Sequence, residues 1–174
     1  MKIEKTKFKN LLIIHNKKYK DPRGYFKEIL KEVDIKEKFP FLVMSYSKKN
    51  VLRGLHYQTT NPQGKFISVL KGKIFDVSVD LRKNSKTYGK YFSCILSDKN
   101  SKSIYIPEGF AHGFYTLEKD NYIFYSCTNY RSKKSEKVLR YNDKQLKIKW
   151  PLKNDKLIIT KKDLNGKTLT EHSK

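Results

Sequence analysis

The sequence has little cysteine and no long apolar run. Its two cysteines, Cys94 and Cys127, lie far apart and neither belongs to a CxxC pair, so we expect reduced packing residues and no disulfide framework. No stretch of about 18 apolar residues occurs, and the first residues lack the apolar core of a signal peptide. These features exclude a disulfide-rich secreted protein and a helical membrane protein, and they predict a soluble protein of the cytoplasm.

Acidic side chains are also scarce, because 17 Asp and Glu stand against 39 Lys and Arg, which gives a formal net charge of +22. Such a charge favours anionic partners, including nucleic acid. Arginine supplies the forks that read phosphates and bases, but it is rare here, and lysine is spread along the whole chain. We therefore expect neither nucleic acid nor a membrane as a partner. A general attraction to anionic ligands such as sugar nucleotides is expected.

The chain is long enough for one core and short for two, so we expect a single domain over residues 1–174. Residues 25–39 carry apolar side chains near helical spacing and are followed by Pro40, which predicts one N-terminal helix. The aromatic content of 13% favours strands elsewhere. Besides a short apolar run at residues 11–14, strands are expected over residues 41–47, 51–57, 66–70, 74–81, 91–96, 103–106, 114–117, 122–128 and 138–141. Their spacing is typical of an antiparallel sandwich or barrel.

Three stretches carry side chains suited to chemistry. The first is Arg53-Gly54-Leu55-His56-Tyr57-Gln58, where a glycine between polar residues indicates that something comes close to the backbone. The second, Pro107-Glu108-Gly109-Phe110-Ala111-His112, and the third, Tyr122-Ile123-Phe124-Tyr125, add a histidine and a tyrosine. If the strands form one barrel, alternation turns His56, Lys65, His112 and Tyr125 into a common cavity.

Histidines inside a small barrel often hold a metal, but the ligand set is incomplete here. The position two residues after His56 holds Gln58, and the place where an acid would follow holds Gln63 and Lys65. Two imidazoles without a carboxylate are too few ligands, and an ammonium group repels a divalent cation. We therefore expect no metal.

The same side chains suit proton transfer next to a carbonyl group. His56 has the pKa range of a general base, and Lys65 or Arg53 can stabilise the enolate oxygen that forms. Tyr125 can return a proton from the opposite face, which inverts the carbon. A histidine base needs a carboxylate on its other ring nitrogen. The sequence offers three candidates without ranking them: Asp163, Asp76 and Asp80.

With these residues the chain resembles the dTDP-4-dehydrorhamnose 3,5-epimerases, cupin-fold enzymes of activated deoxysugar synthesis for surface polysaccharide. The resemblance covers nearly the whole chain. Its further motifs are Asp21-Pro22-Arg23-Gly24-Tyr25-Phe26, Gln63-Gly64-Lys65, Asp76-Val77-Ser78-Val79-Asp80-Leu81-Arg82, Asn142-Asp143, Trp150-Pro151 and Lys162-Asp163. It implies an all-β cupin jelly roll with one short N-terminal helix and a short helical C-terminal part. It also implies a homodimeric isomerase without metal or other cofactor.

The resemblance assigns a role to each site residue. It implies His56 as general base, Asp163 as its orienting carboxylate, Tyr125 as general acid and Lys65 as the group near the C4 oxygen. Substrate-binding positions are implied at Arg23, Phe26, Arg53, Gln58, His112 and Arg131. In a family dimer, Arg23 and Phe26 belong to the partner's nucleotide site.

Two positions differ from similar sequences. Where those carry a Gln-x-Asn pair at the nucleotide, this chain reads Phe41-Leu42-Val43, and Arg131 stands where a second tyrosine is frequent. The difference predicts weak discrimination among bases, or preference for a purine that stacks on Phe26 or Phe41. The base, the sugar and the inverted carbons (C3, C5 or both) stay open. So do two alternatives, a 3,4-ketoisomerase of the same superfamily and a non-catalytic jelly roll that binds sugars or polyanions.

Overall fold

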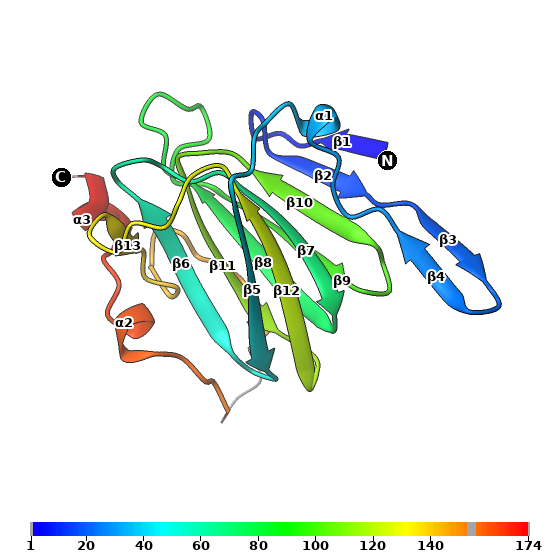
Figure 1. The fold of residues 1–174 in the computed structure, drawn as a ribbon. Coiled ribbons are helices and arrows are strands. Elements are labelled where there is room, and N and C mark those ends of the chain that lie inside the picture. The colour runs from blue at the N-terminus through cyan, green and yellow to red at the C-terminus, as the bar shows by residue number, and fades with distance from the viewer. Residues whose placement is uncertain (1, 153–155, 174) are drawn as a thin grey trace.

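The computed structural model describes residues 2–152 and 156–173, and it consists mainly of two antiparallel sheets that face each other as a jelly roll (Figure 1). The six-stranded sheet contains, in spatial order, β1 (Lys2–Lys5), β2 (Leu12–His15), β10 (Lys102–Ile106), β7 (Lys65–Lys71), β12 (Asp120–Cys127) and β5 (Phe41–Lys48). The five-stranded sheet contains β13 (Glu136–Val138), β6 (Leu52–Gln58), β11 (Phe110–Thr116), β8 (Lys73–Asp80) and β9 (Tyr91–Ser97). Within the described residues, no helix is long and apolar enough to span a membrane.

Strand alternation places the main core between the sheets. On β7, Ile67 and Val69 are fully buried and face inward, where they pack with Ile74 of β8. Val77 and Val79 of β8 belong to a different cluster on the outer side of the five-stranded sheet. The expected all-β fold is therefore correct, and each sheet is buried on both faces over part of its area.

Irregular segments cover those outer faces. Residues 139–150 lie over the five-stranded sheet, where the Trp150 ring packs edge-on against Phe75 at 5.8 Å and its Nε1–H donates to the Tyr141 carbonyl at 2.8 Å. On the six-stranded sheet, Phe39 packs edge-on against Phe66 and Tyr105. The two covers bury the outer faces of the sheets, so the interior between the sheets holds the main core and whatever functional side chains lie beside it.

The predicted helix over residues 25–39 is wrong for most of its length. Its first part is strand β4 (Gly24–Lys27), which pairs with β3 (Lys18–Asp21) in a two-stranded hairpin. Only α1 (Glu32–Ile35) is helical, and it ends at Lys36, which is in the left-handed region with φ 62°. Helical spacing misled here because Phe26 and Val33 are 67% and 77% exposed and form no buried face.

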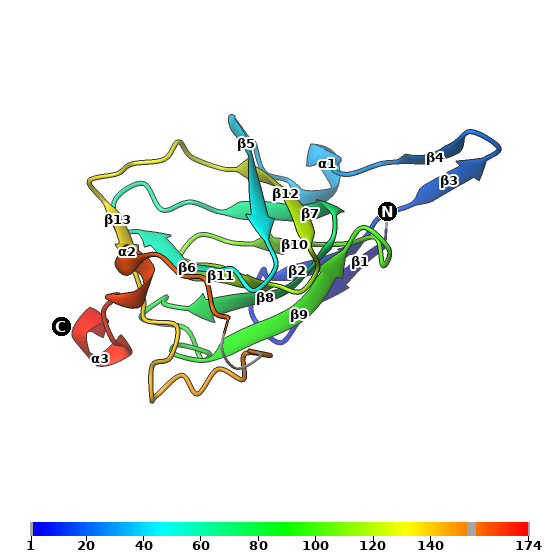
Figure 2. The same cartoon turned by 90° about the horizontal axis from the view of Figure 1, so that it is seen from below.

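The strand predictions over residues 41–128 are confirmed, with shifts at their ends, and β11 begins at Phe110, earlier than expected. The predicted strand over residues 138–141 is wrong, because β13 already ends at Val138. The C-terminal part contains the short helices α2 (Lys161–Leu164) and α3 (Leu169–Ser173), as expected. The β3–β4 hairpin, which the sequence did not predict, extends away from the body of the molecule (Figures 1 and 2).

Candidate active site

A cavity of about 350 Å³ lies between the two sheets. Six of the candidate catalytic and substrate-binding residues line it: Arg53, His56, Lys65, His112, Tyr125 and Arg131. They come from β6, β7, β11, β12 and the segment that leads to β13. The structure confirms the expectation that one cavity is shared by His56, Lys65, His112 and Tyr125.

Gly54 brings β6 and β11 close together at this point. A Cβ atom on this residue would lie 2.6 Å from the His112 carbonyl oxygen and 2.7 Å from the Gly113 Cα, and its φ of 107° is in the region that favours glycine. The close approach places His56 directly opposite His112 in the strand register. The sequence signal for a close backbone contact at Gly54 is therefore confirmed.

Asp163 is the carboxylate that meets His56. Its Oδ1 lies 2.7 Å from His56 Nε2, and its Oδ2 accepts a hydrogen bond from the Gly54 N–H at 3.1 Å. Thr160 caps the short helix α2, since its Oγ1 accepts from the Asp163 N–H at 3.2 Å. Burial raises the pKa of Asp163, but the hydrogen bonds from His56 and Gly54 outweigh burial and hold the pKa below its usual value. Asp163 is therefore ionised and fixed behind the imidazole.

The other two candidate carboxylates have different partners. Asp76 Oδ2 lies 2.8 Å from His112 Nε2, and both side chains are buried. Burial lowers the pKa of His112, and the Asp76 carboxylate opposes this effect. Asp80 instead accepts from the guanidinium of Arg82 at 2.9 and 2.7 Å. Each histidine of the cavity thus has a carboxylate of its own.

Lys65 and Tyr125 face the cavity from the six-stranded sheet. Burial lowers the pKa of the Lys65 ammonium, while Cys127, Glu136 and Asp76 act in the opposite direction. Burial raises the pKa of Tyr125, and its hydroxyl lies 3.0 Å from Ser45 Oγ. Tyr125 therefore carries its proton at neutral pH, while Lys65 is poised to lose one more readily than a solvated lysine.

Charged side chains occupy two further places in the cavity wall. Arg53 Nε donates to Ser47 Oγ at 2.9 Å, which directs the guanidinium along the wall. Arg131 forms a two-pronged ion pair with Glu136, from Nε to Oε1 at 3.1 Å and from Nη2 to Oε2 at 2.9 Å. The Lys162 ammonium binds the same carboxylate. Burial raises the pKa of Glu136, but the two cations outweigh it and hold the pKa at about 2.

Glu136 was missed by the sequence reasoning. A signal was present, because it is an acidic residue in a segment otherwise rich in lysine and follows Arg131 by five positions. Ser45, the partner of the Tyr125 hydroxyl, was also missed. It lies in the inward-facing row of β5, which alternation does reveal.

Three predicted residues lie elsewhere. The predicted substrate-binding role of Gln58 is corrected by its contacts. The loops at the end of β6 close over this residue: its Nε2 donates to the Asn61 carbonyl at 2.7 Å, and its Oε1 accepts from the Ser132 N–H at 2.7 Å. We therefore reassign Gln58 from substrate binding to support of the loop that carries Arg131. Arg23 and Phe26 lie on the exposed β3–β4 hairpin, away from this chain's own cavity.

The described residues contain no group of three or more His, Cys, Asp or Glu side chains placed to share a metal ion. The polar groups of the cavity form separate pairs, His56 with Asp163 and His112 with Asp76. Such pairs are suited to hold and move protons.

Comparison with known proteins gives one consistent family. Residues 5–171 match the family model described as dTDP-4-dehydrorhamnose 3,5-epimerase. The dTDP-4-dehydrorhamnose 3,5-epimerase of Methanothermobacter thermautotrophicus is 43% identical, over 97% of this chain and 94% of that protein. The Shigella flexneri protein of the same name is 38% identical, over 98% and 97% of the two chains.

Solved structures agree with the sequence comparison. The dTDP-6-deoxy-D-glucose-3,5-epimerase of Legionella pneumophila, in complex with dTDP-4-keto-L-rhamnose, superimposes with a TM-score of 0.93 at 42% identity, over 97% of this chain and 93% of that one. The Bacillus anthracis enzyme with TDP and PPi bound gives a TM-score of 0.91 at 33% identity, over 96% and 98%. The chain therefore belongs to the dTDP-4-dehydrorhamnose 3,5-epimerase family.

Proposed function

We propose that this protein is a 3,5-epimerase of a nucleotide-linked 4-keto-6-deoxy sugar, acting in activated deoxysugar synthesis. The observation that carries the proposal is the His56–Asp163 pair, joined at 2.7 Å, in one cavity with Lys65 and Tyr125. Family membership supports it, as does the keto sugar nucleotide bound by the Legionella relative.

The first step is removal of a proton from the carbon beside the ketone. When His56 donates its Nε2 hydrogen to Asp163, the other ring nitrogen, Nδ1, is left as the acceptor for that proton. The electron pair of the C–H bond moves into the C4 carbonyl and forms an enolate. Lys65 stabilises the negative oxygen, and its lowered pKa makes it a stronger hydrogen-bond donor.

The second step returns a proton from the other face. Tyr125 lies on β12 of the six-stranded sheet, whereas His56 lies on β6 of the five-stranded sheet, so the two groups approach the cavity from opposite walls. The raised pKa of Tyr125 keeps its hydroxyl protonated until the enolate carbon accepts the proton. Proton loss to one wall and gain from the other inverts the carbon.

Substrate binding is assigned to the remaining polar side chains of the cavity. The guanidinium groups of Arg53 and Arg131 attract the diphosphate. His112, held by Asp76 at 2.8 Å, presents its other ring nitrogen to a sugar hydroxyl or to the ketone. These groups orient the sugar between the base and the acid.

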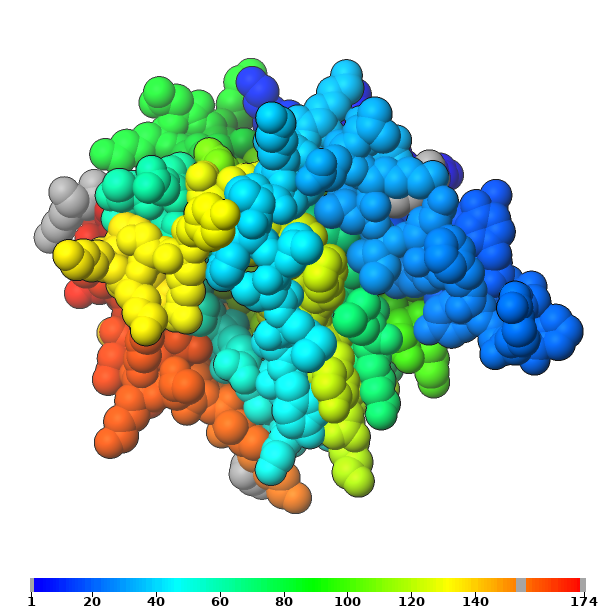
Figure 3. All heavy atoms as spheres, viewed as in Figure 1, coloured from blue at the N-terminus to red at the C-terminus, as the bar shows by residue number. Residues whose placement is uncertain are grey.

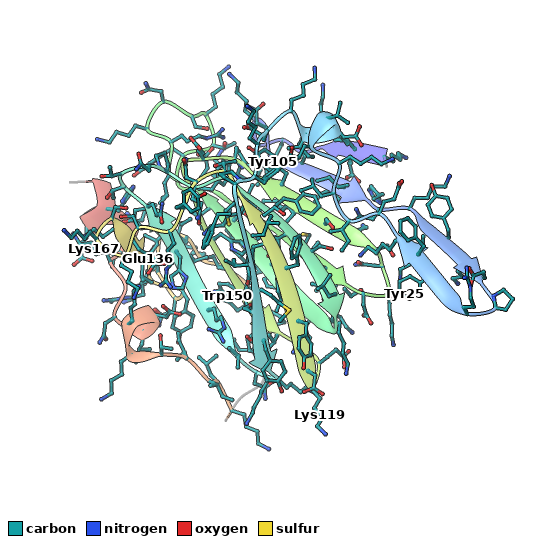
Figure 4. The ribbon with its side chains drawn as sticks, viewed as in Figure 1. Tyr25, Tyr105, Lys119, Glu136, Trp150 and Lys167 are labelled. Carbon is teal, nitrogen blue, oxygen red and sulfur yellow. The ribbon has the colours of Figure 1, made fainter. Side chains whose placement is uncertain are left out.

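We also propose a homodimer in which the β3–β4 hairpin serves the partner's nucleotide site. Figure 4 shows Tyr25 on this hairpin and Glu136 at the cavity rim on opposite sides of the molecule. The Arg23 side chain is 90% exposed, and Phe26 is also exposed. A second copy that covers the exposed β5 residues Leu42 and Met44 would use these groups and shield an apolar strand face.

The proposed place of action is the cytoplasm. Cys94 and Cys127 are both free thiols, which suits a reducing compartment.

Exchange of substrate hydrogens in deuterated water tests the reaction. The purified protein is incubated with a panel of 4-keto-6-deoxy sugar nucleotides and the products are followed by NMR. Label at both C3 and C5 is the expected result. Label at a single carbon would assign a one-centre epimerase or a ketoisomerase, and absence of label with every substrate would leave only a binding protein.

A further inference from the structure

A second cavity lies between residues 7–10, which join β1 to β2, and residues 82–87, which follow β8. In Figure 3 these two segments meet at the top of the molecule, the first in dark blue and the second in green. The cavity has a volume of about 580 Å³, compared with about 350 Å³ for the active-site cavity. Among the described residues that line it, none is a candidate catalytic or substrate-binding residue. It is therefore a separate feature of the molecule.

The two walls of this second cavity are fixed to each other. Arg82 spans them, because its Nη1 donates to the Lys9 carbonyl at 2.9 Å while its Nε and Nη2 bind the buried Asp80 carboxylate at 2.9 and 2.7 Å. The guanidinium also lies 4.6 Å from the centre of the Phe110 ring. Ser85 Oγ donates to the same Asp80 carboxylate at 2.6 Å. A ligand would thus meet a preformed site, which lowers the entropy that binding costs.

The positive charges of the cavity are not all neutralised. Arg82 is compensated by Asp80, which takes both prongs of its fork. The ammonium groups of Lys7, Lys9 and Lys86, in contrast, have no ion pair or hydrogen bond with another described residue. No carboxylate is found among the described residues that line the cavity. Three positive charges therefore remain for a ligand.

The acidic residue closest in sequence to this site faces another way. Gly109 packs against the Arg82 side chain, and Glu108 precedes it. The Glu108 Oε1 accepts from Thr128 Oγ1 at 2.9 Å and from Asn129 Nδ2 at 3.1 Å. These hydrogen bonds hold the carboxylate on the side of β12 and away from the three lysines.

A third cavity shows that abundant lysine alone does not produce such a site. It lies at the turns after β7, β9 and β11 and is lined by four lysines, but three acidic residues line it as well. One of the lysines, Lys73, pairs with Glu118 at 3.3 Å. The excess of uncompensated charge beside Arg82 is therefore a local property and not only a consequence of the net charge of the chain.

The neutral side chains of the second cavity narrow the class of ligand. The amides of Asn10 and Asn84 make no hydrogen bond to another described residue, so their N–H groups can donate to oxygen, as ammonium groups do. Donors on two walls suit a ligand with several anionic oxygens. A base would find neither an open arginine fork nor an exposed ring, since Phe8 and Phe110 are buried beneath the site.

From these observations we propose that the second cavity binds inorganic oligophosphate, such as pyrophosphate or tripolyphosphate. The ammonium groups of Lys7, Lys9 and Lys86 supply the attraction, and the amides of Asn10 and Asn84 orient the phosphate oxygens. Because the attraction is electrostatic and near solvent, binding weakens as the salt concentration rises. The site is independent of the proposed epimerase reaction.

Calorimetric titration with tripolyphosphate tests the proposal on two matched variants. The first combines Lys7→Gln, Lys9→Gln and Lys86→Gln. The control removes the same charge from the third cavity, with Lys71→Gln, Lys99→Gln and Lys119→Gln. All six lysines are exposed, so both variants should fold. We expect binding to weaken by roughly tenfold in the first variant and to stay close to wild type in the control.

Other outcomes of the titration would overturn the proposal. Equal losses in the two variants would show that net charge alone attracts the ligand, and no loss in either would place the ligand elsewhere. Failure of the wild-type protein to bind would have the same consequence. Both variants keep Arg53 and Arg131, so any binding in the active-site cavity contributes equally to all three proteins and the difference reports the second cavity.

Amide NMR spectra of the wild-type protein locate the ligand without any substitution. Tripolyphosphate should shift the resonances of residues 7–10 and 82–87, whereas shifts confined to the active-site cavity would contradict the proposal. A single-stranded DNA oligonucleotide is the comparison ligand. If it binds more tightly than tripolyphosphate and shifts the same resonances, the cavity is a nucleic-acid site and the proposal is wrong.

Discussion

Two histidines lie side by side on the cavity wall formed by β6 and β11, and His56 is the more exposed of the two. The His56 side chain is 30% exposed and that of His112 is 5% exposed, although each is paired with a carboxylate at nearly the same distance. A base must reach the hydrogen that it removes. His56 is therefore assigned the proton transfer, and the more buried His112 keeps the binding role proposed above.

The first prediction concerns this pair. His56→Ala should lower kcat by roughly 10²- to 10⁴-fold, the usual contribution of a general base. Asp163→Asn should keep the fold and lower kcat by a smaller factor, because an amide no longer fixes the imidazole in its basic form. Steady-state kinetics and circular dichroism measure both effects, and near wild-type turnover in either variant would move the base elsewhere.

A second prediction separates the acid from the base. Tyr125→Phe removes the buried proton donor but leaves the His56–Asp163 pair in place. We expect this variant still to exchange hydrogen at C3 in deuterated water and to fail to complete inversion at C5. If all exchange is lost, Tyr125 holds the substrate or polarises the ketone.

The sequence revealed the residue types of the site but not their pairing. Asp163 lies 107 positions from His56, and the fold alone brings them together. Spacing along the sequence did not rank the three candidate carboxylate partners of His56, which are Asp163, Asp76 and Asp80. Only the family resemblance pointed to Asp163. The reason is physical: Asp163 lies on helix α2 and His56 on β6, so their meeting depends on how these elements pack in the fold, which no local pattern contains.

At the scale of elements, the turn after β8 is held by one carboxylate. Asp80 accepts from Arg82 and also from the hydroxyl groups of Ser85 and Thr87, each at 2.6 Å. Burial raises the pKa of Asp80, but these hydrogen bonds outweigh it and lower the pKa to about 2. The turn beyond β8 is thereby tied to the end of its strand.

Asp80→Asn should therefore reduce the free energy of unfolding by about 2 kcal/mol at neutral pH. A carboxyl group whose pKa falls on folding stabilises the protein above its unfolded pKa, near 3.9, and this stability is lost as the pH falls toward the folded pKa. The difference between wild type and variant should thus shrink between about pH 4 and pH 2. Denaturant titration at several pH values measures it, and a difference independent of pH would exclude the ionised carboxylate as its cause.

The elements also differ in how far the sequence determines them. Strands from β5 onward follow from short apolar runs between turn signals, because alternation is set by burial against the core. The hairpin β3–β4 was not predicted, since its exposed Tyr25 and Phe26 have no burial pattern within one chain. The proposed dimer would give these residues a partner surface to bury against.

At the scale of the whole molecule, the proposed dimer makes a prediction that a monomer cannot satisfy. Arg23→Ala removes a hairpin contribution, and His56→Ala removes the base of the cavity. When the two inactive variants are mixed and allowed to exchange subunits, each mixed dimer contains one complete site. We expect recovery of roughly a quarter of the wild-type rate. No recovery after confirmed subunit exchange would place Arg23 in the site of its own chain.

The cover over the five-stranded sheet has a practical consequence. Trp150 is the single tryptophan of the chain, and it packs on Phe75 in the outer cluster, whereas the cavity lies between the sheets. Its fluorescence should therefore report detachment of this cover and global unfolding, with little response to a ligand in the cavity. The natural emission of the protein thus gives a stability signal that is independent of substrate binding, and no label has to be introduced.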